Sequence, residues 1–199
     1  MVKDGIPYVI VPFAVALLFG YFQLWMVAVL FVLLAAFMAY FFRDPRRVLP
    51  EGTGLIVSAA DGRVTRIEDQ GETKLISVFL SPFDVHINRS PITGIVTKVD
   101  YVAGKKAPAT SDSSSLVNER NSLTIEGEHF AVVCTQIAGI LARRIVCWKK
   151  AGDSLVAGER FGLIKFSSRT DLLIPGGAEV LVKTGDRVKG GETVIARLA

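Results

Sequence analysis

The first 42 residues are almost entirely apolar, and this is the strongest pattern along the chain. No charged residue occurs from Gly5 to Phe42, and Gln23 is the one strongly polar residue in that stretch. A helix needs about 20 apolar residues to span a bilayer, whereas the apolar core of a signal peptide has only about 7 to 15. The pattern therefore predicts a membrane-anchoring element over residues 1–42.

A short interruption, Gly20–Gln23, divides this stretch into apolar segments at Tyr8–Phe19 and Leu24–Phe42. Positive residues flank the stretch on both sides: Lys3, Arg43, Arg46 and Arg47. Because positive charge marks the cytoplasmic side of a membrane, we expect a helical hairpin with both ends in the cytoplasm. A single long tilted helix with Lys3 outside is the competing topology. Aromatic residues at the expected interfaces are Tyr21, Trp25 and Tyr40.

The pattern changes at Asp44-Pro45, since a proline disfavours helix in the residue before it. Short β-branched runs follow, and glycine or proline separates most of them: Leu55–Val57, Val64–Ile67, Lys74–Leu80, Gly94–Tyr101, Ser122–Ile125, Phe130–Ile137 and Arg144–Trp148. This spacing is typical of a compact β-rich domain with hairpin connections. Only Gly139–Arg143 has the character of a helical turn.

From Pro175 onward, short valine-rich strands alternate with glycine turns. This arrangement is similar to the hairpin halves of a biotinyl/lipoyl-type barrel-sandwich. The predicted fold class is therefore mainly β, with a barrel-sandwich-like domain over residues 43–199 behind the helical membrane hairpin. No lysine stands at an exposed hairpin tip with the neighbours that a carrier lysine requires, which argues against a swinging-arm carrier.

Composition narrows the functional classes. The net charge of +4 comes without a long Lys/Arg run, so binding of nucleic acid has little support, whereas anionic lipid head groups suit a tethered basic domain. Cys134 and Cys147 lie in apolar surroundings, which predicts buried thiols in a reducing compartment. No CxxC pair and no histidine at metal-ligand spacing occurs, so we expect no metal site.

Each of two polar stretches can be interpreted either as purely structural or as functional. Ala107–Ser115, rich in Ser, Thr, Ala and Pro, predicts a mobile loop, either a plain surface connection or a lid over a site. Phe166–Asp171 contains Ser167 and Ser168 side by side. Such a pair is either an ordinary strand with small polar residues or a site at which the backbone cuts itself.

Six motifs occur in order along the chain. They are Phe42-Arg43-Asp44-Pro45, Ser58-Ala59-Ala60-Asp61-Gly62, Asp84-Val85-His86-Ile87-Asn88-Arg89-Ser90-Pro91, Asn118-Glu119-Arg120-Asn121, Gln136-Ile137-Ala138-Gly139 with Ala142-Arg143-Arg144, and Phe166-Ser167-Ser168-Arg169. Together with the membrane hairpin, they resemble the short prokaryotic-type phosphatidylserine decarboxylases, including relatives that act on archaeal serine lipids. The resemblance covers nearly the whole chain, with Ala59 where the family usually has proline.

The resemblance implies a pyruvoyl enzyme made by self-cleavage between Ser167 and Ser168. Ser168 Oγ would attack the carbonyl carbon of Ser167, and elimination and hydrolysis would leave a pyruvoyl group on the fragment 168–199. The fragment 43–167 would be the β-chain of the catalytic domain and 168–199 the α-chain. The pyruvoyl ketone would form a Schiff base with the serine head group of phosphatidylserine, which would be decarboxylated to phosphatidylethanolamine.

The resemblance also implies roles for individual residues. Histidine starts near the pKa that a general base needs, and the chain has two histidines. His129 belongs to an expected solvated hairpin tip, so His86 is the expected base, with Asp61 orienting it in a Ser-His-Asp relay. Arg89, where longer family members have a second histidine, is an expected ligand for the substrate carboxylate or phosphate. Asn118 and Arg144 are expected ligands of the same kind.

Ser167 departs from the family, which carries glycine immediately before the reactive serine. A serine in a positive-φ conformation costs about 1 to 2 kcal/mol, so we expect a trapped precursor without the pyruvoyl group. Localisation at the cytoplasmic face of the cell membrane is expected, and a homodimer is a further expectation. The rival hypothesis is a non-enzymatic membrane-anchored barrel-sandwich adaptor, which leaves Asp61, His86 and the serine pair without a role.

Overall fold

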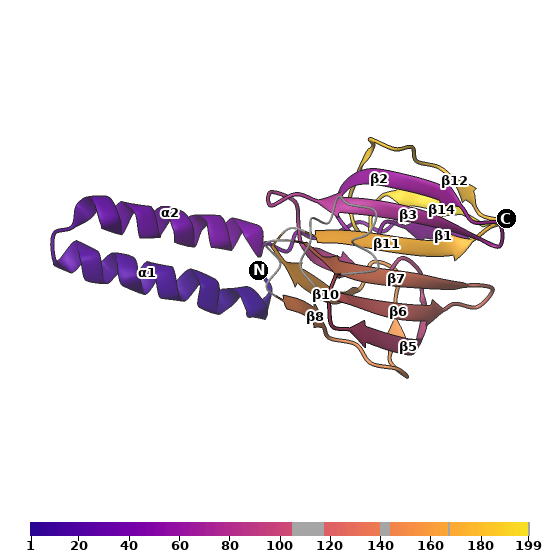
Figure 1. Ribbon diagram of the computed structural model, residues 1–199, viewed down its shortest axis with the longest axis horizontal. Helices are drawn as coiled ribbons and strands as arrows, with labels where there is room; N and C mark the ends of the chain where they lie inside the picture. The colour runs from indigo at the N-terminus through magenta and orange to yellow at the C-terminus, as the bar shows by residue number, and fades with distance from the viewer. Residues whose placement is uncertain (105–117, 140–143, 167, 199) are drawn as a thin grey trace. The chain divides into compact units, whose positions relative to one another are not determined.

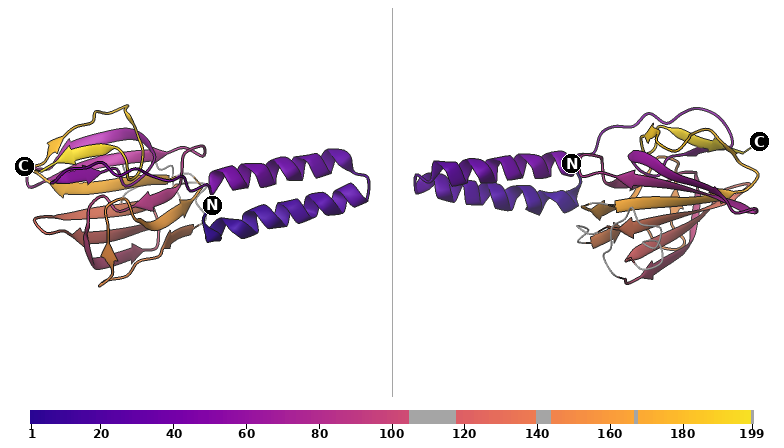
Figure 2. Two further views of the ribbon diagram at one scale, coloured as in Figure 1. Left: turned by 180° about the vertical axis from the view of Figure 1, so that it is seen from behind. Right: turned by 45° about the horizontal axis from the view of Figure 1, so that its top comes forward.

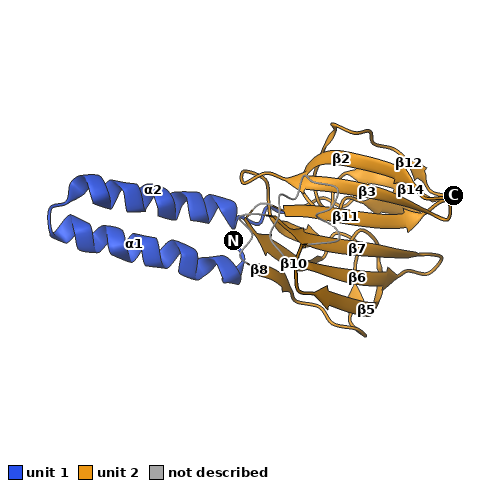
Figure 3. Ribbon diagram, viewed as in Figure 1, with its two compact units in different colours: residues 1–46 blue, residues 47–199 orange. Residues whose placement is uncertain are grey.

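The computed structural model describes residues 1–104, 118–139, 144–166 and 168–198. The expected loop Ala107–Ser115 lies outside the described residues, as do Ser167 and most of the expected helical turn Gly139–Arg143. The chain divides into two compact units, residues 1–46 and residues 47–199 (Figure 3).

The first unit is a pair of helices. A short 3-10 turn, Lys3–Gly5, leads into α1, Ile6–Tyr21, and α2 spans Trp25–Phe41. The chain reverses between them with Gln23 in a left-handed conformation, at φ 59°, and the two helices pack side by side (Figure 1). The N-terminal segment is therefore a hairpin, and the alternative of one long helix is wrong.

Both helices carry apolar side chains on all sides. Lys3–Tyr21 is long and apolar enough to cross a membrane by length and composition, and Trp25–Phe41 is a shorter apolar helix. Large apolar side chains on both helices are exposed: Leu17 at 62% and Met26 at 90%. Helices that are apolar all round are found in a large core or in a membrane, and within this unit most of that surface has no protein neighbour.

The second unit is mainly β, as the sequence predicts. Its strands are β1 Leu55–Val57, β2 Gly62–Asp69, β3 Thr73–Leu80, β4 Ile87–Arg89, β5 Gly94–Val102, β6 Arg120–Glu126, β7 Ala131–Ala138, β8 Arg144–Cys147, β9 Ser154–Leu155, β10 Arg160–Lys165, β11 Ser168–Pro175, β12 Glu179–Val180, β13 Arg187–Val188 and β14 Val194–Arg197. A curled eight-stranded sheet has the order β13-β2-β3-β11-β7-β6-β5-β9. Figure 2 shows the curl from two further directions.

Two small sheets complete this unit, in the orders β4-β10-β8 and β1-β14-β12. β4 is not among the β-branched runs that the sequence pattern predicts, because two of its three residues, Asn88 and Arg89, are polar. The main core lies on one face of the large sheet, where alternate residues such as Ile76 and Val78 of β3 and Leu172 and Ile174 of β11 are buried. This alternation is the period of two that a half-buried strand requires.

The two cysteines differ in environment. Cys134 lies fully in the core, and burial, together with the charge of Asp171, raises the pKa of its thiol far above the ordinary value. Cys147 is only partly buried, and its thiol donates to the Lys149 carbonyl at 3.2 Å. The expectation of buried thiols is thus confirmed for Cys134 and wrong for Cys147, because Cys147 ends its strand at the edge of a three-stranded sheet.

Candidate active site

The serine pair follows β10 in the sequence, and Ser168 opens β11. Ser168 is the first residue of β11 and pairs with Leu80 of β3 on one side and Ala138 of β7 on the other. Its side chain is fully buried. Ser168 Oγ has no hydrogen-bond partner among the described residues, and Ser167 is not one of them. The structure therefore places a buried hydroxyl at the expected cleavage point.

Phe166, between β10 and β11, has a left-handed backbone conformation, at φ 67°. It is the one non-glycine residue with positive φ in the described part of the β-rich unit. For a bulky residue this conformation costs about 1 to 2 kcal/mol, and strain of this kind clusters at functional sites. The strained residue directly precedes Ser167, so the backbone beside the expected cleavage point is held away from a relaxed conformation.

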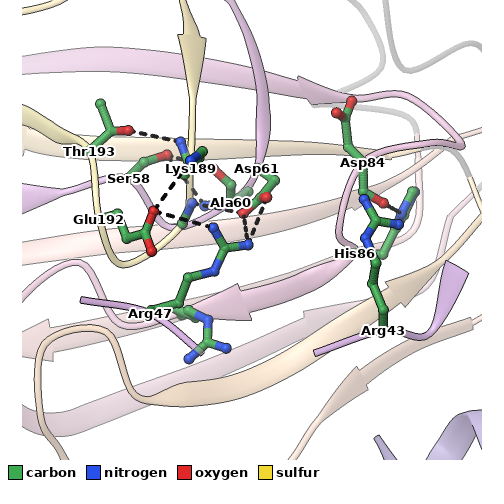
Figure 4. Close-up of polar contacts among 12 residues, drawn as sticks. Arg43, Arg47, Ser58, Ala60, Asp61, Asp84, His86, Lys189, Glu192 and Thr193 are labelled. Atoms are coloured by element: carbon green, nitrogen blue, oxygen red, sulfur yellow. Dashed lines mark hydrogen bonds and ion pairs between the residues drawn. The ribbon is translucent and has the colours of Figure 1, made fainter. Parts of the chain in front are cut away.

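His86 ends the loop between β3 and β4. The Ile164 amide donates to the His86 carbonyl at 3.2 Å and so extends the pairing of β4 with β10 by one residue. The histidine is only 2% exposed. Its Nδ1 lies 3.0 Å from the carbonyl oxygen of Asp84 (Figure 4). A buried imidazole is thus held by the backbone of its own loop.

A side-chain hydrogen bond joins the strand that follows His86 to the strand that begins with Ser168. Asn88 Nδ2 donates to Thr170 Oγ1 at 2.9 Å, which joins β4 to β11. His86 is two residues before Asn88 and Ser168 is two residues before Thr170, so each shares a strand face with its bonded neighbour. Both steps run toward the connection between β10 and β11, because Ile164, near the end of β10, lies opposite His86. His86 and Ser168 are therefore each two residues away in sequence from one member of this bonded pair.

A network of hydrogen bonds between buried side-chain amides links β6, β7, β4 and β11. Asn121 Nδ2 donates to Gln136 Oε1 at 3.1 Å, and Gln136 Nε2 donates to Asn88 Oδ1 at 2.9 Å. The hydrogen-bond network thus extends from β6 through β7 and β4 to Thr170 of β11, and each of its four side chains is at most 3% exposed. Buried networks of this kind hold strands in one arrangement when all members are satisfied.

Asp61 has partners of its own. Arg47 Nη2 donates to both carboxylate oxygens, at 2.9 and 2.8 Å, and the Gly190 amide donates to Oδ1 at 2.9 Å. Figure 4 shows Asp61 and His86 pointing at these different partners. In the described contacts the group that meets His86 Nδ1 is therefore a backbone carbonyl, whereas Asp61 ties Arg47 to the C-terminal segment.

The three expected substrate ligands differ in exposure. Arg89 is 8% exposed and donates to the Gly158 carbonyl at 3.0 Å. Asn118 is fully buried and donates to the Ala138 carbonyl at 2.7 Å, which holds the strand that flanks Ser168. Arg144 is exposed at the start of β8, where it pairs with Lys165. Of the three, Arg144 is the cation most open to solvent beside the cleavage segment.

His129 lies in the turn between β6 and β7 with 77% of its side chain exposed, which confirms the expected solvated hairpin tip. Sequence reasoning gave no role to Asp84, Ser81, Asn88, Gln136 or Arg47. A signal was available for one pair: serine followed by proline and, three residues after the serine, by aspartate is a turn pattern. Asn88 and Gln136 belong to two of the six motifs, but the motifs do not show what they bond, because their partners lie 82 and 48 residues away.

Comparison with known proteins gives a consistent result. The sequence profile described as phosphatidylserine decarboxylase matches residues 34–196. A phosphatidylserine decarboxylase proenzyme of Symbiobacterium thermophilum is 47% identical over 98% of this chain and 94% of its own length. The proteins of the same name from Solibacter usitatus and Gluconobacter oxydans are 43% and 49% identical, over 99% and 82% of this chain and 96% and 77% of their own lengths.

Proposed function

The chain belongs to the phosphatidylserine decarboxylase family, and we propose that its active form arises by self-cleavage of the backbone between Ser167 and Ser168, a step that Ser167 blocks in this chain. Its relatives carry the name proenzyme, which supports a precursor that is processed. The adaptor hypothesis loses its basis, because the family match extends from residue 34 to residue 196. The observation that supports the proposal is the Asn88–Thr170 bond, which joins the strand after His86 to the strand that begins with Ser168.

In the first step His86 takes the hydroxyl proton of Ser168, and Oγ attacks the carbonyl carbon of Ser167. The C–O bond forms, the C–N bond breaks, and His86 gives the proton to the leaving nitrogen, so the peptide becomes an ester and Ser168 gains a free amino group. His86 suits the role of base because a neutral imidazole accepts a proton near neutral pH. The buried position of Ser168 keeps bulk water from competing for the Ser167 carbonyl.

In the second step a base removes the Cα proton of Ser168, and the carboxylate of Ser167 leaves with the ester oxygen. The chain is then cut, and residue 168 becomes dehydroalanine. Water hydrolyses its imine form, releasing ammonia and leaving a pyruvoyl group at the start of residues 168–199. Backbone pairing of β11 with both β3 and β7 keeps this new terminus in place.

The residues around Ser168 fit such a group, since the buried Oγ meets no hydrogen-bond partner in the described part of the chain. The pyruvoyl group supplies an electron sink for loss of carbon dioxide from a serine head group. His86 then delivers a proton to the carbon that carbon dioxide leaves, and the product is phosphatidylethanolamine. Asp61 takes part by fixing Arg47 and the Gly190 backbone in this region.

Arg144 is the proposed ligand for the substrate phosphate or carboxylate, because guanidinium forms paired hydrogen bonds with either group and this one is exposed. Arg89 and Asn118 support the same site, through the Gly158 loop and the end of β7. The serine head group is common to diacyl and archaeal ether lipids, so these residues serve either backbone.

The helical hairpin anchors the enzyme in the cell membrane, where its substrate resides. The apolar length of Lys3–Tyr21 supports this, and the positive residues at both ends of the hairpin favour a cytoplasmic position of the catalytic unit. A homodimer is part of the same proposal, and the mass of the detergent-solubilised protein by light scattering checks it.

Ser167 makes this chain a trapped precursor in the proposal. The family glycine lacks a Cβ, whereas Ser167 follows a residue that is already strained, at φ 67°. Mass spectrometry of the purified chain tests this: one full-length species is expected, and two fragments with a pyruvoyl-capped C-terminal piece would refute the trapped state. Ser167→Gly is expected to cut itself and to release carbon dioxide from a serine lipid. If the Ser167→Gly variant shows no cleavage and no turnover, the proposed enzyme mechanism is refuted.

A further inference from the structure

The loop that carries His86 begins with a closed turn at Ser81–Asp84. Asp84 Oδ2 accepts hydrogen bonds from Ser81 N at 2.8 Å and from Ser81 Oγ at 2.6 Å. The Asp84 amide donates back to the Ser81 carbonyl at 2.9 Å. Pro82 occupies the second position, where its fixed φ favours a turn. Three hydrogen bonds and a proline thus define the position of Asp84.

This turn decides where the Asp84 carbonyl points. That carbonyl lies 3.0 Å from His86 Nδ1. A carbonyl oxygen can only accept, so Nδ1 must carry the proton and Nε2 of the neutral ring keeps its lone pair. General-base catalysis needs this lone pair. The hydrogen bonds of Asp84 and the tautomer of His86 are therefore linked through two residues of backbone.

The other oxygen of Asp84 has a weaker partner. Arg187 Nη1 lies 3.3 Å from Asp84 Oδ1, and the Arg187 side chain is 69% exposed while that of Asp84 is 14% exposed. An exposed ion pair contributes little to stability. The two bonds from Ser81, which are shorter and less exposed, hold the carboxylate.

We propose that Asp84 is a positioning residue: its carboxylate holds the Ser81–Asp84 turn, and the turn fixes His86 in the tautomer with the proton on Nδ1 and none on Nε2. The proposal rests on the proposed function, in which His86 is the base. It assigns to a backbone carbonyl the orienting role that a carboxylate has in Ser-His-Asp relays.

The test reads the tautomer itself and needs no turnover. The full-length chain, labelled with ¹⁵N-histidine in detergent micelles, contains two histidines, and His129→Gln assigns the exposed one. Long-range ¹H–¹⁵N spectra of the neutral ring are expected to show the proton on Nδ1 of His86. Asp84→Ala is expected to shift a large fraction of His86 to the Nε2–H tautomer. Unchanged His86 signals in a folded Asp84→Ala chain would overturn the proposal.

Matched variants separate this role from general stability. Asp84→Asn keeps an acceptor for Ser81 and is expected to retain the wild-type tautomer, and Arg187→Ala is expected to do the same. If Asp84→Ala does not fold, Ser81→Ala removes only the hydroxyl bond and is expected to show a partial shift. Wild-type His86 signals in folded Ser81→Ala would then count against the proposal that the Ser81–Asp84 hydrogen bonds fix the His86 tautomer.

Activity gives the second readout, in the Ser167→Gly background. Asp84→Ala is expected to slow self-cleavage by about tenfold to a hundredfold, within the range that a general base contributes, whereas Asp84→Asn stays within about twofold of its parent. The two proposals fail differently. Rapid cleavage by His86→Ala would remove His86 as base, whereas an unshifted tautomer would remove only the role of Asp84.

Discussion

Asn88 Nδ2 donates to Thr170 Oγ1 at 2.9 Å, and this bond joins a three-residue strand to the strand that begins with Ser168. The two residues are 82 positions apart in the chain. The other atom of the Asn88 side-chain amide, Oδ1, accepts a hydrogen bond from Gln136 Nε2. Since β4 pairs with β10 and not with the large sheet, this side-chain link joins β4 to a strand of the large sheet.

Asn88→Ala tests that link. The substitution leaves Gln136 Nε2 and Thr170 Oγ1 without their buried partner, which costs about 1 to 3 kcal/mol of unfolding free energy. We expect a lower urea midpoint and, in the Ser167→Gly background, self-cleavage slowed by at least about tenfold. Urea unfolding and the gel time course of the fragment 168–199 measure the two effects.

Ser122→Ala is the matched control for Asn88→Ala. Ser122 shares a hydrogen bond of 2.9 Å with Thr135, between β6 and β7 away from β4. Its loss is expected to cost about 0.5 to 1.5 kcal/mol with cleavage within about twofold of the parent. Equal slowing by both variants would reduce the role of Asn88 to general stability.

His86→Ala in the Ser167→Gly background is expected to stay full length on a gel, because no other imidazole is buried in the described part of the chain. His129→Ala in the same background is the control, and it is expected to cleave like its parent because the side chain is 77% exposed. Efficient cleavage of His86→Ala would exclude His86 as the base.

The Arg47–Asp61 pair predicts a coupled effect. The two side chains are 7% and 15% exposed, and breaking a buried pair costs about 3 to 5 kcal/mol, so Asp61→Ala is expected to destabilise the chain by about 3 kcal/mol. If Asp61 acts through Arg47, the double variant Arg47→Ala/Asp61→Ala cleaves no more slowly than either single variant. Additive losses of cleavage rate would instead give Asp61 a separate role in the reaction.

Glu159 predicts a dependence of stability on pH. A hydrogen bond from Lys149 and another from the Val156 amide lower the pKa of this carboxyl. A lowered pKa in the folded state means that the stabilisation is present above the ordinary pKa of glutamate and is lost as pH falls through the folded value.

Glu159→Gln removes this dependence. The carboxyl is 40% exposed, so the difference in unfolding free energy is below about 1 kcal/mol after screening by solvent. Urea midpoints measured from pH 7 down to pH 3 are expected to differ between wild type and Glu159→Gln at neutral pH and to converge in acid. A constant difference over this range would contradict the prediction.

The local pattern of apolar and polar residues was sufficient to predict which segments of this protein form helices and most of those that form strands. A charge-free run predicts apolar helices whatever follows it, and the interruption at Gly20–Gln23 marks the reversal that the structure contains. Short β-branched runs between glycines predict most strands of the β-rich unit. The pattern missed β4, since two of its three residues, Asn88 and Arg89, are polar and do not form an apolar run.

For the site, residue types and motif order singled out Ser168 and His86, because few side chains can act as nucleophile or base. Their partners depended on contacts between distant segments. Only the tertiary structure pairs Asp61 with Arg47 and Gly190 and Asn88 with Thr170. It also sets the Asp84 carbonyl against His86 Nδ1. The physical reason is that a sequence motif specifies which atoms can donate and accept, whereas the packing of strands far apart in the chain decides which of them meet.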